Sequence, residues 1–122
     1  MLRSCLIATL SLLLVAAMIH LPGCRAEPGI DRRFGTYYQH MGAPSHRVVE
    51  AARETIDNMQ LQLIDESTSG HRTRFQTRNA FDARITISVE PRGSESTRVG
   101  VRVTGGSEGL SSEVFNQIRD RL

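Results

Sequence analysis

The sequence of this 122-residue chain predicts one small α+β domain, in which a four-stranded antiparallel meander packs against an N-terminal and a C-terminal helix. Three observations lead to this fold class. Apolar residues recur at helical spacing near both ends of the domain, strict two-residue alternation fills the stretch between them, and short connections rich in glycine or proline separate the alternating runs. Because the sheet has one apolar face and both helices need an apolar partner, we expect a two-layer sandwich with both helices on that face.

The first helix is expected at residues 44–59. Pro44 and Ser45 suit its first turn and cap, and its apolar face consists of Val48, Ala52, Ile56 and Met59. Four alternating runs then predict the strands, at residues 61–66, 72–78, 84–90 and 97–104. Clean alternation with short connections favours an antiparallel meander with one dry and one wet face.

A second amphipathic segment closes the chain. Gly105-Gly106 ends the last strand, and a helix is expected from Ser111, as its cap, to Leu122. Leu110 and Phe115 are spaced for a hydrophobic staple at the start of this helix. The order of elements is therefore helix, four strands, helix.

The N-terminal segment has the parts of a secretory leader. Arg3 makes the first residues positive, and residues 5–19 carry no charge. This apolar run of about 15 residues is short of the roughly 20 that a permanent membrane helix needs. The sequence Leu21-Pro22-Gly23-Cys24 follows and resembles the bacterial lipobox, whose cysteine thiol receives a diacylglycerol. We therefore expect lipidation at Cys24, although Pro22 departs from the small residues that are usual there.

Cysteine usage agrees with this interpretation. Removing the leader also removes Cys5, so the mature chain keeps Cys24 alone and has no intramolecular disulfide. We expect three segments, namely a signal peptide at 1–23, a lipid anchor and tether at 24–43, and the α+β domain at 44–122. An uncleaved N-terminal anchor and a cleaved, secreted form stay open, and all three alternatives place the domain outside the cytoplasm. The lipoprotein, which we expect, would lie in the bacterial cell envelope, anchored to the membrane and facing the periplasm or the exterior. By analogy with other bacterial lipoproteins, an Asp after the acylated cysteine would favour the inner membrane, so Arg25 at this position favours the outer one.

Four segments of the mature chain carry a family resemblance, and they read VVEAARETIDNMQLQLID, RITISVEP, RVGVRVTGG and SSEVFNQIRDRL. Together with the lipobox and the glycine-containing spacer, they resemble a family of small bacterial lipoproteins known only as a domain of unknown function. The resemblance covers most of the mature chain. It implies a helix, a β-meander and a closing helix, and it brings neither catalytic residues nor a cofactor.

Arginine is the only basic residue type in the chain, and several arginines gather on the expected wet face of the sheet. These candidates for anion binding are Arg72, Arg74, Arg78, Arg84, Arg98 and Arg102. Clustered guanidinium groups can hold phosphates or carboxylates, which would suit anionic lipid, lipopolysaccharide or an acidic cell-wall polymer. The alternative is a solvated face whose charges protect the sheet from edge-to-edge pairing. Nucleic acid is not expected, because few aromatic residues lie among the charges.

Other reactive residues do not form a recognisable site. The histidines of the mature chain lack metal-ligand spacing, and these are His40, His46 and His71. Ser111-Ser112 has no nucleophile motif around it. The acids of the first helix alternate with arginines, as on an ordinary charged surface, and these are Glu50, Glu54 and Asp57. We therefore expect a non-enzymatic lipoprotein without metal or cofactor that binds an unknown protein or cell-wall partner. Anion binding by the arginines is the second hypothesis, and an enzyme is the third. An exposed edge strand leaves a homodimer open.

Overall fold

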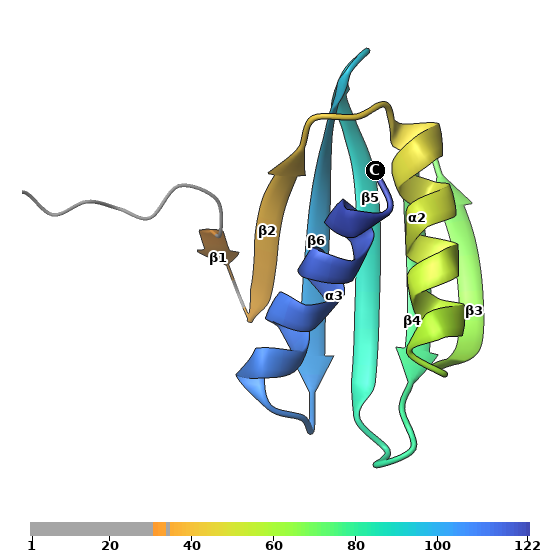
Figure 1. Ribbon diagram of the computed structural model, residues 1–122, viewed down its shortest axis with the longest axis vertical. Helices are drawn as coiled ribbons and strands as arrows, with labels where there is room; N and C mark the ends of the chain where they lie inside the picture. The colour runs from red at the N-terminus through yellow and green to blue at the C-terminus, as the bar shows by residue number, and fades with distance from the viewer. Residues whose placement is uncertain (1–30, 34) are drawn as a thin grey trace, which may run out of the picture.

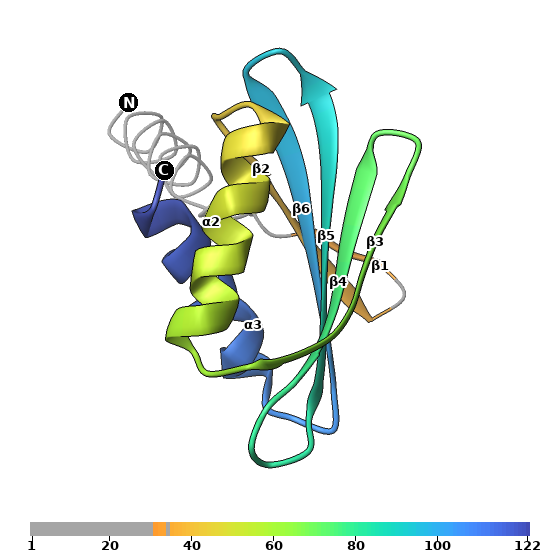
Figure 2. The same ribbon diagram turned by 90° about the vertical axis from the view of Figure 1, so that its right-hand side faces the viewer.

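The fold is that of a computed structural model, which describes residues 31–33 and 35–122. In chain order its elements are β1 (Asp31–Arg33), β2 (Thr36–Met41), α2 (Ser45–Asn58), β3 (Gln62–Ser69), β4 (Arg72–Arg78), β5 (Arg84–Gly93), β6 (Ser96–Thr104) and α3 (Glu108–Asp120). The strands form one antiparallel sheet in the order β1-β2-β6-β5-β4-β3 (Figure 1). Both helices lie on the same side of this sheet (Figure 2). The expected signal peptide and Cys24 lie outside the described residues.

The α+β class is confirmed, but the expected number of four strands is wrong. The sheet has six strands, five of which are at least six residues long. The main addition is β2, which lies in the segment that we expected to be a tether at 24–43. It pairs with β6 from Tyr37 opposite Val101 to Met41 opposite Thr97. Without β2, one edge of β6 would have no partner, and a long unpaired edge is a liability that proteins usually cover.

Helix α2 forms because one side of it is apolar and small. Its buried residues are Val48, Ala51, Ala52, Thr55 and Ile56. Pro44 occupies the N-cap position, so Ser45 is the first helical residue instead of the cap, and no side chain caps this end. The helix ends where Gln60 takes a positive φ of 56°, which lets the N–H of Leu61 donate to the carbonyl of Ile56.

Helix α3 begins earlier than the sequence predicts. Its N-cap is Ser107, and its first residue is Glu108, a carboxylate placed favourably at the positive end of the helix dipole. The expectation that Ser111 is the cap is therefore wrong, since Ser111 lies inside the helix and is buried. Leu110 and Phe115 both lie within the helix too, so they do not form the expected staple. The glycine in the first turn, Gly109, is a poor helix former and hides this start in the sequence.

Strand ends also differ from expectation. Strand β3 continues to Ser69, and every one of its residues is exposed because it is the outermost strand on its side. Strand β5 continues through Pro91, where we expected a turn. The pairing of β4 with β5 reaches only Val89, so Pro91 has a strand neighbour on one side alone, and proline is tolerated in such a place.

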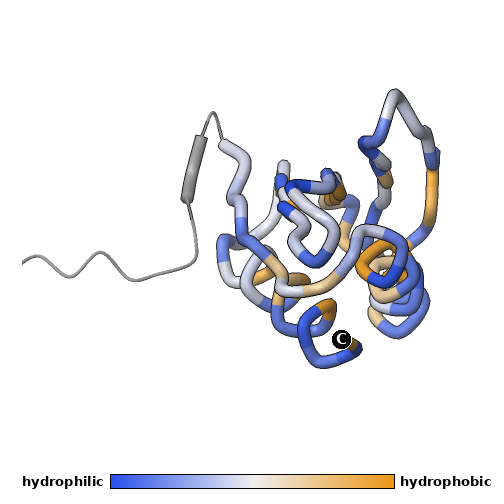
Figure 3. Tube along the Cα trace, turned by 90° about the horizontal axis from the view of Figure 1, so that it is seen from above, coloured by the Kyte–Doolittle hydropathy of each residue, from blue (hydrophilic) through white to orange (hydrophobic). Residues whose placement is uncertain are grey.

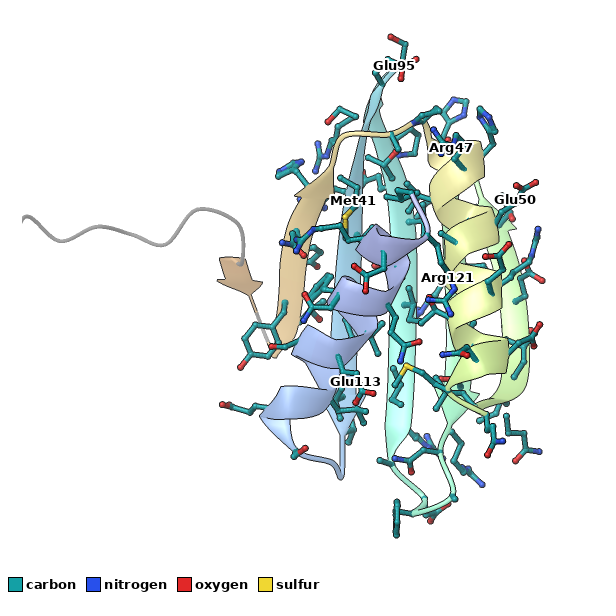
Figure 4. The ribbon with its side chains drawn as sticks, viewed as in Figure 1. Met41, Arg47, Glu50, Glu95, Glu113 and Arg121 are labelled. Atoms are coloured by element: carbon teal, nitrogen blue, oxygen red, sulfur yellow. The ribbon has the colours of Figure 1, made fainter. Side chains whose placement is uncertain are left out.

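The core lies between the sheet and the two helices. Its largest fully buried side chains include Phe75 from β4 and Phe115 from α3. In the view from above in Figure 3, the hydrophobic residues of the helices lie toward the sheet, and the sides of the helices that face away from it are hydrophilic. Met41 at the end of β2 is only 2% exposed and points into this layer (Figure 4). Among the described residues, the buried and partly buried members of the core lie within residues 37–122, and we therefore use residues 31–122 as the domain to test.

The two helices also contact each other. Arg121, just after α3, reaches toward α2 (Figure 4), and its Nε lies 3.7 Å from Oε2 of Glu54. The amide of Asn58 donates to Oε1 of Gln117 over 2.9 Å. Within residues 31–33 and 35–122, no helix is both long enough and apolar enough to cross a membrane.

Candidate anion-binding site

The face of the sheet that turns away from the helices carries the arginines. Cross-strand partners in an antiparallel sheet share a face, and the register pairs Arg78 with Arg84, and Arg102 with Thr86. The alternation along each strand then brings the whole set that the sequence singled out to this face, which we call the arginine face: Arg72, Arg74 and Arg78 from β4, Arg84 from β5, and Arg98 and Arg102 from β6. None of the described elements covers this face (Figure 2).

Two of these arginines have partners within the fold. The Nη2 atom of Arg98 donates to Oε2 of Glu90 over 2.8 Å, and its guanidinium lies 4.5 Å from the ring centre of Tyr38. The Nε atom of Arg78 lies 3.2 Å from Oδ1 of Asp82. These contacts hold both side chains in place and offset their charge.

The other four have no such partner. Within the described residues, no ion pair or side-chain hydrogen bond holds Arg72, Arg74, Arg84 or Arg102, and all four are exposed. They come from three neighbouring strands. The arginine face therefore presents four guanidinium groups whose donors are available to a ligand.

Two hollows lie among these four arginines. The larger has a volume of about 410 Å³ and is lined by Ile64, Arg74, Gln76, Thr77, Arg78, Arg84, Thr86, Arg102 and Thr104. The smaller has a volume of about 170 Å³ and is lined by Thr36, Tyr38, Arg72, Arg74, Thr86, Ser88 and Arg102. Arg74, Thr86 and Arg102 line both, so the hollows adjoin and an elongated ligand would contact both.

Small residues at the centre of the sheet make the smaller hollow. Ser88 of β5 pairs with Gly100 of β6, and the lack of a side chain at Gly100 leaves room for a neighbouring ring. The ring of Tyr38 lies over this glycine, since a Cβ at Gly100 would stand 2.9 Å from Cε1 of the ring. An aromatic side chain that covers a strand glycine in this way shields the backbone and sets the ring position. Long arginines therefore surround a low floor of serine, threonine and tyrosine.

This arrangement can bind anions. The planar guanidinium fork matches the oxygens of phosphate and carboxylate groups, and the hydroxyls of Thr36, Thr86 and Ser88 add neutral donors. In the described part of the chain, neither hollow is lined by His, Asp, Glu or Cys, the residue types that most often act as general bases.

Of the other candidates from the sequence, His40 of β2 pairs with Arg98 and therefore shares the arginine face, whereas Ser111 and Ser112 lie in α3. Within residues 31–33 and 35–122, no group of three or more His, Cys, Asp and Glu side chains could hold a metal ion. Ser111 and Ser112 line a third hollow of about 230 Å³ at the start of α3, together with Tyr37, Glu108, Gly109 and Phe115. The hydroxyl of Ser111 is buried there without a hydrogen-bond partner among the described residues.

Sequence reasoning missed the part of the site that β2 supplies. Thr36 and Tyr38 were assigned to a tether, so their place on the arginine face could not be anticipated. The signal that was available is the Thr-Tyr-Tyr run, because threonine and tyrosine are enriched in strands.

Comparison with known proteins gives one result. Residues 4–121 match the family described as "Protein of unknown function (DUF3568)", which is nearly the whole chain. No curated protein matches it. Because the match leaves out only the first three residues and the last one, the chain belongs to the DUF3568 family of proteins of unknown function.

Proposed function

We propose that this protein is a bacterial envelope lipoprotein, anchored through an acylated Cys24, whose domain is a non-enzymatic module that binds an anionic ligand. The leader and the Leu-x-Gly-Cys sequence support the anchor and its address, with the outer membrane favoured by Arg25. The observation that carries the ligand class is the group of four unpartnered arginines around the two adjoining hollows.

A purely protective role for these charges fits the sheet poorly. Charged side chains guard a sheet against edge-to-edge pairing when they lie on its edge strands. Here the arginines lie on β4, β5 and β6, and all three strands are paired on both sides. Arg74, Arg84 and Arg102, which have no ion-pair partner among the described residues, line the larger hollow together, and an anionic ligand there would offset their mutual repulsion.

The shape of the site favours a ligand with several anionic groups. The four arginines without an ion-pair partner come from three strands, and they line two adjoining hollows. One small monovalent anion would contact only part of this set. Phosphate- or carboxylate-bearing envelope components fit better, such as an anionic lipid headgroup, lipopolysaccharide or an acidic cell-wall polymer.

The experiment measures binding of inorganic tripolyphosphate to residues 31–122 by calorimetry. The test variant replaces Arg74, Arg84 and Arg102 with Ser, and the matched control replaces Arg47, Arg53 and Arg119, which lie on the helices and carry the same total charge. Hydrogen bonds to charged groups contribute about 1.5–3 kcal/mol each, so we expect the test variant to lose affinity by about 100-fold or more. Binding should also weaken with added salt.

The control variant should keep most of the affinity, because its arginines do not line the hollows. Equal losses in both variants would mean that only net charge matters, and no binding to the wild-type segment would reject the proposal. Thermal unfolding of all three proteins checks that each is folded.

A further inference from the structure

The turn between β4 and β5 holds a phenylalanine out in solvent. Phe81 is 90% exposed, far more than the other exposed large apolar residues in the described part of the chain, Leu63 at 46% and Ile64 at 50%. We propose that this turn inserts into the interface of an anionic lipid bilayer, with Phe81 among the acyl chains and Arg84 and Arg102 at the lipid phosphates. This inference rests on the proposed function, because it names lipid phosphate as the anion that the arginine face binds.

Four backbone N–H groups of the turn are hydrogen-bonded within the turn itself. The side-chain oxygen of Asn79 accepts from the N–H of Phe81 over 3.0 Å and from the N–H of Ala83 over 2.9 Å. The N–H of Asp82 donates to the carbonyl of Asn79, and the N–H of Asn79 donates to the carbonyl of Ala83. Unsatisfied backbone groups are what keeps most loops out of a bilayer. Four N–H groups of this turn would carry no such penalty on leaving water.

The exposure of Phe81 follows from a turn that these bonds hold in one shape. Asp82 adopts a left-handed conformation with φ of 65°, a position where aspartate is one of the few residues tolerated. Ala83, two residues after Phe81, is only 1% exposed, so the chain returns to the core at once. The turn therefore presents one aromatic side chain at a defined tip, with a short polar segment around it.

The charges next to this tip match an anionic surface. Arg78 and Arg84 form the last cross-strand pair before the turn, and Asp82 beside Phe81 is offset by its ion pair with Arg78. Arg84 has no ion-pair partner among the described residues, and it lines the larger hollow together with Arg102. Basic residues close to a membrane are attracted by anionic headgroups. The β5–β6 turn with Glu95 lies at the opposite end of the sheet (Figure 4), while the β4–β5 turn lies at the lower end in Figure 1.

The chain offers a direct optical test, since it has no tryptophan. Phe81→Trp places a single fluorophore at the tip, and Leu63→Trp places one on an exposed apolar position of β3. The full-length protein is reconstituted into vesicles of phosphatidylcholine alone, or with phosphatidylglycerol, that carry bromine on the acyl chains. Because the N-terminal segment is present in every variant, the depth of the tryptophan is the quantity compared, and flotation checks that each protein is on the vesicles.

Phe81→Trp should show emission at shorter wavelength and bromine quenching in phosphatidylglycerol vesicles, with little of either in phosphatidylcholine alone. Adding Arg84→Ser and Arg102→Ser should abolish this quenching, whereas Arg53→Ser and Arg119→Ser on the helices should not. Arg78 is left intact because its loss would free Asp82 and change the turn itself.

Solvent-like emission from position 81 in both vesicle types, or quenching as strong at position 63 as at 81, would overturn the inference. Its failure is separable from failure of the proposed function. Tripolyphosphate binding that depends on the arginine face, with an unquenched tryptophan at 81, would reject lipid as the ligand and keep anion binding.

Discussion

Two phenylalanines, one inside β4 and one in the turn that follows it, allow a matched test of the fold. Phe75, in the middle of β4, is completely buried, and Phe81, in the turn, is 90% exposed. Changing each to alanine removes the same atoms, so the difference in effect measures the difference in burial. A domain of this size unfolds with a free energy of about 5–13 kcal/mol, and the core substitution should remove a large share of it.

Burial sets the expected magnitudes. Loss of a core phenylalanine costs about 3–5 kcal/mol, the sum of lost transfer free energy and of the cavity left behind. Phe75 lies in the principal core with residues of both helices, which limits how far its surroundings can relax. An exposed position away from special features changes stability by no more than about 0.5 kcal/mol, so Phe81→Ala should be close to neutral.

Urea unfolding of residues 31–122, followed by circular dichroism, checks both values. Because Phe75→Ala could leave too little folded protein to measure, Phe75→Leu serves as a milder variant, with an expected cost of about 1 kcal/mol and a fall in Tm of about 4–8 °C. If Phe81→Ala destabilised the domain as much as the Phe75 variants do, the turn would pack against the core, and the reasoning from exposure would be refuted.

Two further predictions concern the arginine face and the anchor. Gly100→Ala should lower the free energy of unfolding by about 1 kcal/mol, because the new methyl would stand 2.6 Å from Oγ of Ser88 and 2.9 Å from the Tyr38 ring. Overpacking costs about 1–3 kcal/mol, which exceeds the gain from a less flexible unfolded chain. Unchanged stability in urea unfolding would contradict this contact. Metabolic labelling with a palmitate analogue should mark the wild-type protein and leave Cys24→Ala unmarked, whereas equal labelling of both, or none of the wild type, would reject lipidation at Cys24.

Much of the sheet could be predicted because its central strands follow a simple pattern. Ile85, Ile87 and Val89 alternate with polar residues, and Val99, Val101 and Val103 do the same in the neighbouring strand. These residues face the helices, so burial of one side imposed the two-residue period. Strand β4 has the bounds that the alternation predicts, at Arg72–Arg78.

Strand β2 escaped prediction for a physical reason. Its core-facing side consists of Tyr37, Gln39 and Met41, and only Met41 is both apolar and fully buried. A partly buried glutamine in the middle removes the apolar alternation that marks a strand. Pairing with β6 stabilises β2. Because the paired residues of β6 lie about 60 positions later in the chain, this contact leaves no signal in the local sequence.

The arginine set of the candidate site could be placed from the alternation alone, but its geometry could not. Which arginines have partners depends on the cross-strand register, as with Arg98 and Glu90. The hollow depends on Gly100 and on a tyrosine from β2. The start of α3 was missed because Gly109 interrupts the helical pattern. For the same reason Ser111 was predicted to be the cap, whereas it lies inside the helix.

The most direct test of anion binding observes the arginines themselves. In the NMR spectrum of residues 31–122, each arginine contributes a side-chain Nε–Hε signal, and tripolyphosphate is added in steps. The signals of Arg74 and Arg102, which line both hollows, should shift most, with Arg72 and Arg84 next, while Arg47, Arg53 and Arg119 stay in place. Shifts spread evenly over all arginines, or confined to those of the helices, would contradict a binding site on the arginine face.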